Sequence, residues 1–119
     1  MTATDPTQHM DPEILNRAVC AAANWLDEHN GAGPAELAAR VLKVVEEAGE
    51  AAAAWIGVTG QNPGKGYTHT YADVAAELAD TAFAALVAIE SLNGDAAQEL
   101  HNAAAKVLAR VTVTGVRPC

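Results

Sequence analysis

Apolar side chains recur every three or four residues in separate stretches of this chain, which is the spacing of helices that bury one face. The first stretch carries Ile14, Leu15, Ala18, Val19, Ala22, Trp25 and Leu26. The second carries Leu37, Val41, Val44, Val45, Ala48, Ala52 and Trp55, and the third Val74, Leu78, Phe83, Leu86, Val87 and Ile89. Together with a fourth, alanine-rich stretch, they predict helices at about 11–30, 34–57, 71–92 and 95–113.

Helix-start and helix-stop residues set these limits. Asp11 before Pro12 is a cap followed by a first-turn proline, and Pro34 after a glycine-containing break opens the second helix. Gly57 is predicted to end that helix, and the glycine-rich segment up to residue 70 reads as a loop. Asn93–Gly94 stops the third helix, and Asp95 caps the fourth.

Four amphipathic helices with two short connections and one longer one predict an all-α, four-helix bundle-like domain. With 119 residues, the chain suits a single domain over residues 11–119. Residues 1–10 are polar and without pattern, and we expect a flexible tail there. The β-branched tail at residues 111–116 is expected to fray the end of the fourth helix or to add a short segment of extended chain.

Composition narrows the classes of function. Half of the chain is apolar, but much of that half is alanine and aromatic residues are only 4%, so the core is thin and a homo-oligomer, as a dimer or tetramer, is expected. The 15 acidic and seven basic residues give a net charge of −8, which disfavours nucleic-acid binding. The sequence has neither a long uncharged apolar run nor a signal-peptide pattern, and its two cysteines form no disulfide framework. A cytoplasmic protein without membrane association is expected.

Two acidic pairs interrupt otherwise apolar helices. Glu47 and Glu50 are three residues apart, as are Glu77 and Asp80, so each pair occupies one helix face. If the second and third helices pack antiparallel, the pairs face each other. Four oxygen donors suit Mg²⁺, or Mn²⁺, better than zinc. The alternative is a solvated acidic face, although like charges at this spacing destabilise a helix unless something neutralises them.

At these residues the chain resembles the MazG-like family of all-α nucleoside triphosphate pyrophosphohydrolases. The similar motif is Glu46-Glu47-x-x-Glu50, then 26 residues, then Glu77-x-x-Asp80. Weaker similarity extends from about Trp25 to Arg110. The resemblance implies that Glu47, Glu50, Glu77 and Asp80 bind Mg²⁺, and that Glu46 orients or deprotonates the attacking water.

Five further residues are candidates for substrate binding. Lys106 and Arg110, one turn apart, are placed to contact the β and γ phosphates, although bases at a helix end also suit the helix dipole. Lys43 is near the acidic motif. Trp25 is a candidate for stacking on a base or for packing at a subunit interface, and His29 for a nucleotide contact or a helix cap.

The resulting expectation is Mg²⁺-dependent hydrolysis of a nucleoside triphosphate between the α and β phosphates, giving a monophosphate and pyrophosphate. The alternative is a catalytically silent helical module that binds a nucleotide or a protein. The sequence does not select a base or a sugar.

Overall fold

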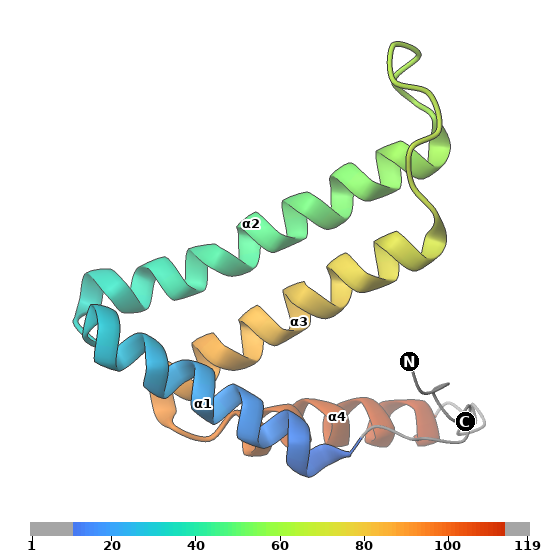
Figure 1. The fold of residues 1–119 in the computed structure, drawn as a ribbon. Helices are drawn as coiled ribbons and strands as arrows, with labels where there is room; N and C mark the ends of the chain where they lie inside the picture. The colour runs from blue at the N-terminus through green and yellow to red at the C-terminus, as the bar shows by residue number, and fades with distance from the viewer. Residues whose placement is uncertain (1–10, 114–119) are drawn as a thin grey trace, which may run out of the picture.

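The computed structural model describes residues 11–113, and these form four helices without a strand. They are α1 (Pro12–Asn30), α2 (Pro34–Thr59), α3 (Tyr71–Asn93) and α4 (Ala96–Val113). Figure 1 shows α2 and α3 side by side and antiparallel, with α1 and α4 crossing near the C-terminal half of α3. The all-α prediction is therefore confirmed. The predicted tail at residues 1–10, and the chain beyond residue 113, lie outside the described residues.

Local signals fix most helix ends as predicted. Asp11 accepts a hydrogen bond from the backbone N–H of Glu13 at 2.9 Å, and Asp95 accepts one from Gln98 at 3.0 Å. The end of α2 was predicted wrongly at Gly57. The helix continues to Thr59, and Gly60 takes the left-handed conformation that ends it, with φ of 64°.

Gly57 instead has a packing role. It is buried, its carbonyl accepts a hydrogen bond from Thr68 N–H at 2.9 Å, and a β-carbon there would collide with the side chains of Thr68 and His69. The glycine thus lets the returning loop lie directly on the end of α2.

Small residues let α2 and α3 approach closely. Ala51 and Ala54 are buried on α2, and Ala88 on α3. A second apolar cluster joins α1, α3 and the start of α4 through Val19, Leu86 and Ala96, and Ala96 is only 2% exposed. Such alanine-rich contacts bury little area per residue, so the core is thin.

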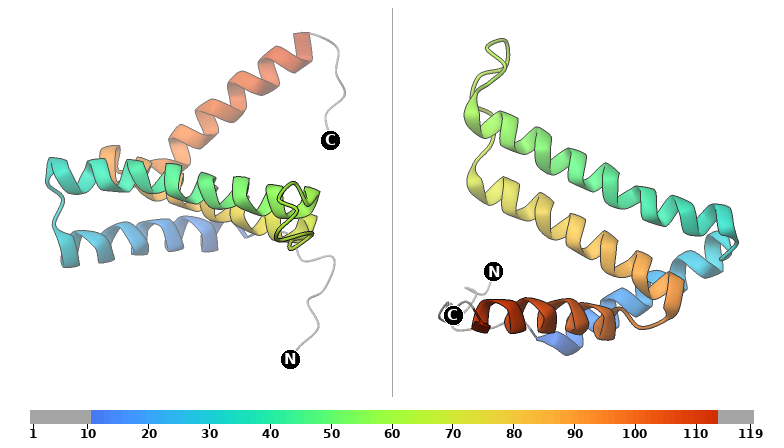
Figure 2. Two further views of the ribbon diagram at one scale, coloured as in Figure 1. Left: turned by 90° about the horizontal axis from the view of Figure 1, so that it is seen from above. Right: turned by 180° about the vertical axis from the view of Figure 1, so that it is seen from behind.

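The larger apolar side chains of α2 point away from this core. Val41 is 46% exposed and Val45 67% exposed, because the face of α2 that packs on α3 is offset from the stripe they form. Residues 97–110 of α4 are also exposed throughout, and this helix diverges from α2 (Figure 2). Apolar periodicity predicted the helices and the core residues Val19, Leu86 and Val87 correctly, but it misplaced the buried face of α2.

One charged side chain connects three helices. Arg40 of α2 is only 5% exposed. It donates to Asp27 of α1 at 2.7 Å, to Ser91 of α3 at 3.0 Å, to Glu36 at 3.1 Å and to the Gly31 carbonyl at 2.9 Å. These hydrogen bonds use nearly every N–H group of the buried guanidinium. Arg40 therefore joins α1, α2 and α3 at one buried polar position.

Within residues 11–113, none of the helices combines the length and the hydropathy needed to cross a membrane.

We expect Arg40→Met to lower the free energy of unfolding by about 2–4 kcal/mol, because it leaves Asp27 and Glu36 without their partner. Thermal unfolding monitored by circular dichroism measures the change. Arg17→Met removes an exposed arginine on α1 and serves as the matched control, with an expected effect within about 0.5 kcal/mol. Equal melting temperatures for the two variants would contradict the structural role of Arg40.

Candidate metal and nucleotide site

Three carboxylates from α2 and α3 meet at the interface of these helices. Glu47, Glu77 and Asp80 each offer an oxygen, and these oxygens lie within 4.8 Å of one another. Glu47 and Glu77 are half-buried, whereas Asp80 is exposed. The antiparallel packing of α2 on α3 therefore places the two acidic motifs opposite each other.

The donor set fits a hard divalent cation. Glu47, Glu77 and Asp80 would hold such a cation, because their oxygens lie within 4.8 Å of one another. Three carboxylates leave further coordination positions for water or phosphate, as is usual for protein-bound Mg²⁺.

Glu50 adjoins this group but is not one of its three closely spaced members. Repulsion from Glu47 is the main cause that raises the pKa of Glu50. Desolvation, the charge of Glu77 and a hydrogen bond with Glu77 act in the same direction. The structure thus concentrates negative charge where the resemblance had placed four ligands.

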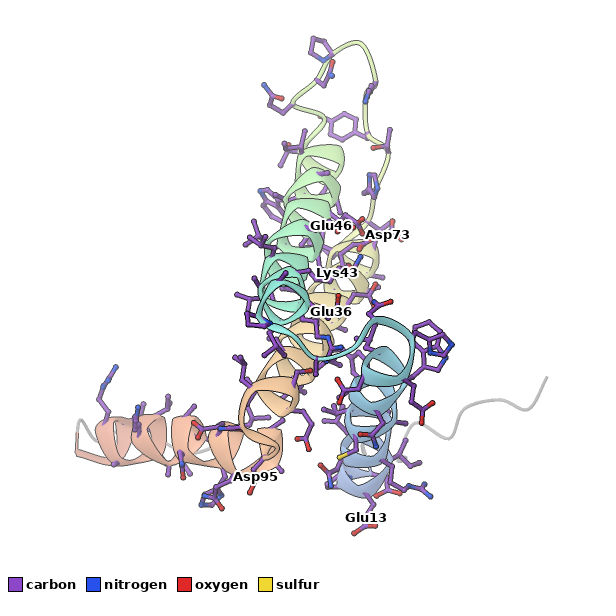
Figure 3. All side chains as sticks on the ribbon, turned by 90° about the vertical axis from the view of Figure 1, so that its left-hand side faces the viewer. Glu13, Glu36, Lys43, Glu46, Asp73 and Asp95 are labelled. Carbon is purple, nitrogen blue, oxygen red and sulfur yellow. The ribbon has the colours of Figure 1, made fainter. Side chains whose placement is uncertain are left out.

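Lys43 partly offsets this charge. Its ammonium donates to Glu46 at 2.9 Å and lies 3.3 Å from a Glu47 oxygen. The hydrogen bonds to Glu46 and then Glu47 raise the pKa of Lys43. Glu46, 60% exposed at its side chain, stands at the edge of the cluster, and Figure 3 shows Lys43 and Glu46 further along α2 than Glu36.

A cavity of about 680 Å³ begins at the carboxylates and continues between α1, α2 and α3. Lys43, Glu47 and Asp80 line it at the acidic end. Its remaining walls are mostly apolar, with a few polar groups near the start of α2: Ala22, Trp25, Leu26, Asn30, Glu36, Ala39, Arg40, Phe83, Ala84 and Val87. An apolar hollow with a few convergent polar groups is the usual form of a small-molecule site.

Trp25 lines this cavity and stacks on His29, which is not one of the lining residues. Their ring centroids are 4.1 Å apart, and the Nδ1 of His29 lies 2.7 Å from the Trp25 carbonyl oxygen. His29 lies in the last turn of α1, one turn after Trp25, and the residue that caps this helix is Gly31. Trp25 is 57% exposed and lines the cavity, so it is available to a ligand.

Lys106 and Arg110 are not brought to the site. Both are exposed on α4, and neither lines the cavity. Their predicted contact with phosphates therefore has no geometric support within one chain.

Sequence reasoning did not predict three polar residues that line the cavity: Asn30, Glu36 and Arg40. The sequence does indicate a buried position for Arg40. This residue lies three residues after Leu37 and four residues before Val44, so it belongs to the same apolar stripe of the helix. Glu36, four residues before it, is the matching partner.

Comparison of the chain with protein-family models, with curated proteins and with solved structures gave no match.

The crowded carboxylates generate a prediction about stability. Because the pKa of Glu50 is raised by folding, its ionisation destabilises the fold: the penalty is absent below the ordinary pKa of 4.5 and develops as the pH rises through the raised value. We expect Glu50→Gln to raise the melting temperature at pH 7 but not at pH 4.

The control for this experiment is Glu28→Gln, the same change at an exposed position of α1. A melting temperature for Glu50→Gln that is unchanged or lower at pH 7 would show that the acidic residues do not repel one another as described.

Proposed function

We propose that this protein is a Mg²⁺-dependent nucleoside triphosphate pyrophosphohydrolase of the MazG-like type. The observation that carries the proposal is the convergence of Glu47, Glu77 and Asp80, two of which, Glu47 and Asp80, also line a largely apolar cavity. The cluster suits a cation that binds phosphates, and the cavity suits the base and sugar.

In this proposal Glu47, Glu77 and Asp80 hold the metal, with Glu50 joining them as the cation relieves their repulsion. When bound, Mg²⁺ neutralises phosphate charge and acidifies water. The water oxygen bonds to the α phosphorus, and the bond from that phosphorus to the bridging oxygen breaks. The products are a nucleoside monophosphate and pyrophosphate.

Glu46 is proposed to take the proton from the attacking water. Its position at the edge of the cluster leaves it outside the closely spaced oxygens, and the contact with Lys43 fixes its orientation. The apolar wall formed by Trp25, Leu26 and Phe83 excludes water from the base and strengthens the charge interactions nearby.

Turnover is tested by incubating each ribo- and deoxyribonucleoside triphosphate with Mg²⁺ and measuring pyrophosphate and monophosphate. We expect Asp80→Asn to reduce the rate more than about a hundredfold, because it weakens both metal binding and charge stabilisation. The matched control is Asp95→Asn, which retains a capping side chain at the start of α4 and should keep its activity.

Full activity in Asp80→Asn, or release of orthophosphate instead of pyrophosphate, would contradict the proposal. Absence of turnover with every nucleotide, together with a nucleotide-dependent rise in melting temperature, would support the silent binding module instead.

We also propose that the protein self-associates through the outer stripe of α2. Val41, Val45, Ala48, Ala52 and Ile56 follow one another at spacings of three or four residues, and each is exposed. This stripe has no charged member and points away from α3. A second copy is the occupant that its composition favours, because a twofold α2–α2 contact pairs like with like and adds burial that the thin core lacks.

Val45→Glu is expected to convert the oligomer to a monomer, because it places a charge in the middle of the stripe. Light scattering coupled to size exclusion measures the mass. Val107→Glu makes the same change at an exposed position of α4 and should leave the mass unchanged. A monomeric parent protein, or the same mass for Val45→Glu as for the parent, would exclude this interface.

A further inference from the structure

The end of the cavity remote from the acidic cluster has its own polar chemistry. Glu36 lies in the first turn of α2, about three helical turns, or roughly 16 Å along the axis, before Glu47. Both residues line the same cavity, and Asn30 lines it beside Glu36. Figure 3 shows Glu36 near the end of α1 and Lys43 further along α2.

The carboxylate of Glu36 is held by only one of its two oxygens. Oε1 accepts from the side-chain amide of Asn30 at 3.1 Å and from Nε of Arg40 at 3.1 Å. Oε2 accepts no hydrogen bond from any residue between 11 and 113. The hydrogen bond from Asn30, followed by that from Arg40, lowers the pKa of Glu36, so the group is an ionised acceptor at neutral pH.

Most donors around Glu36 are committed to the protein, although Asn30 gives only one of its two amide N–H groups to Glu36. Arg40 directs its N–H groups to Asp27, Ser91 and the Gly31 carbonyl besides Glu36. Lys43 is bonded to Glu46 and lies at the acidic end. A ligand edge that reaches this part of the cavity therefore meets a carboxylate whose Oε1 is held by two hydrogen bonds and whose Oε2 accepts none from residues 11–113.

We infer that Glu36 selects nucleotides whose base carries an exocyclic amino group, and that the protein discriminates against uracil and thymine. This inference rests on the proposed function, because it assumes that the phosphates occupy the acidic end and the base the other. The apolar wall at Trp25 and Phe83 lies along the same cavity.

Cytosine and uracil form the sharpest pair for this selection. Cytosine presents an amino donor at position 4, whereas uracil presents a carbonyl acceptor there. The amino group can donate to Oε2 of Glu36, but the carbonyl would place two acceptors against each other without a proton between them. An ionised, partly buried carboxylate oxygen that faces a carbonyl loses its hydrogen bond to the base. Exchanging this one amino group for a carbonyl therefore lowers the affinity strongly.

The first test uses the unmodified full-length protein. We expect kcat/KM for CTP to exceed that for UTP by at least about tenfold, and the same order for dCTP and dUTP. Equal values, or a preference for uracil, would overturn the inference.

The second test is Glu36→Gln. The Gln amide oxygen can still accept from Asn30 and Arg40, while its amino group replaces Oε2 with a donor. We therefore expect the ratio of CTP to UTP to fall by at least about tenfold. A purely structural role for Glu36 would lower both rates together and leave their ratio unchanged, and this result would overturn the inference. Glu28→Gln, exposed and outside the cavity, is the matched control and should retain the parent ratio.

Dissociation constants for CTP and UTP, measured by quenching of tryptophan fluorescence, separate failure of the inference from failure of the proposed function. Tighter binding of CTP than of UTP without turnover would contradict the proposed enzyme activity but support selection of the base by Glu36. Turnover without a preference for cytosine would support the activity but contradict the selection. Absence of binding of either nucleotide would contradict both.

Discussion

The arrangement of the helices depends on the buried guanidinium of Arg40. In a core made largely of alanine, shape alone does little to fix the angle between helices, because small side chains do not interlock deeply. Arg40 compensates with directional bonds to α1, to α3 and to the α1–α2 connection. Since a buried cation is stable only when its hydrogen-bond donors are satisfied, these partners are held in a defined geometry, and the cavity beside them is held with them.

The same interaction explains why the two ends of the cavity differ. Near the start of α2, Glu36 receives donors from Arg40 and Asn30 and carries an ordered charge. Further along, Lys43 is the one base of residues 11–113 that is ion-paired with the acidic residues around Glu47, Glu50 and Glu77, and repulsion from Glu47 raises the pKa of Glu50. One end therefore resembles a preorganised hydrogen-bonding site, and the other a site that becomes favourable when a cation arrives.

Local sequence signals were sufficient for the helices and for the acidic pairs, because both depend on neighbours within one or two turns. Asp11, Asp95 and Gly94 act at short range, and so does the three-residue spacing of Glu77 and Asp80. Which side chains of α2 pack against the other helices could not be predicted in this way, because those contacts join residues that are far apart in the sequence. The larger residues Val41 and Val45 suggested a buried face, yet α2 packs through Arg40, Ala51 and Ala54, since close helix approach requires small side chains at the contact.

On α2 several small side chains are buried and several larger apolar ones are exposed. The packing that forms the site therefore also determines the outer surface of this helix. Because α2 packs through Arg40, Ala51 and Ala54, it leaves Val41, Val45 and Ile56 exposed, where water contact is unfavourable. Burying that stripe against a second copy would stiffen α2 from the opposite side, at the level of Lys43 and Glu47. The carboxylates repel one another, so a rigid α2 would keep them from spreading apart and would preserve their spacing for the proposed metal. If the protein both self-associates and binds a metal as proposed, the two events are coupled through a single helix, and a loss of one should weaken the other.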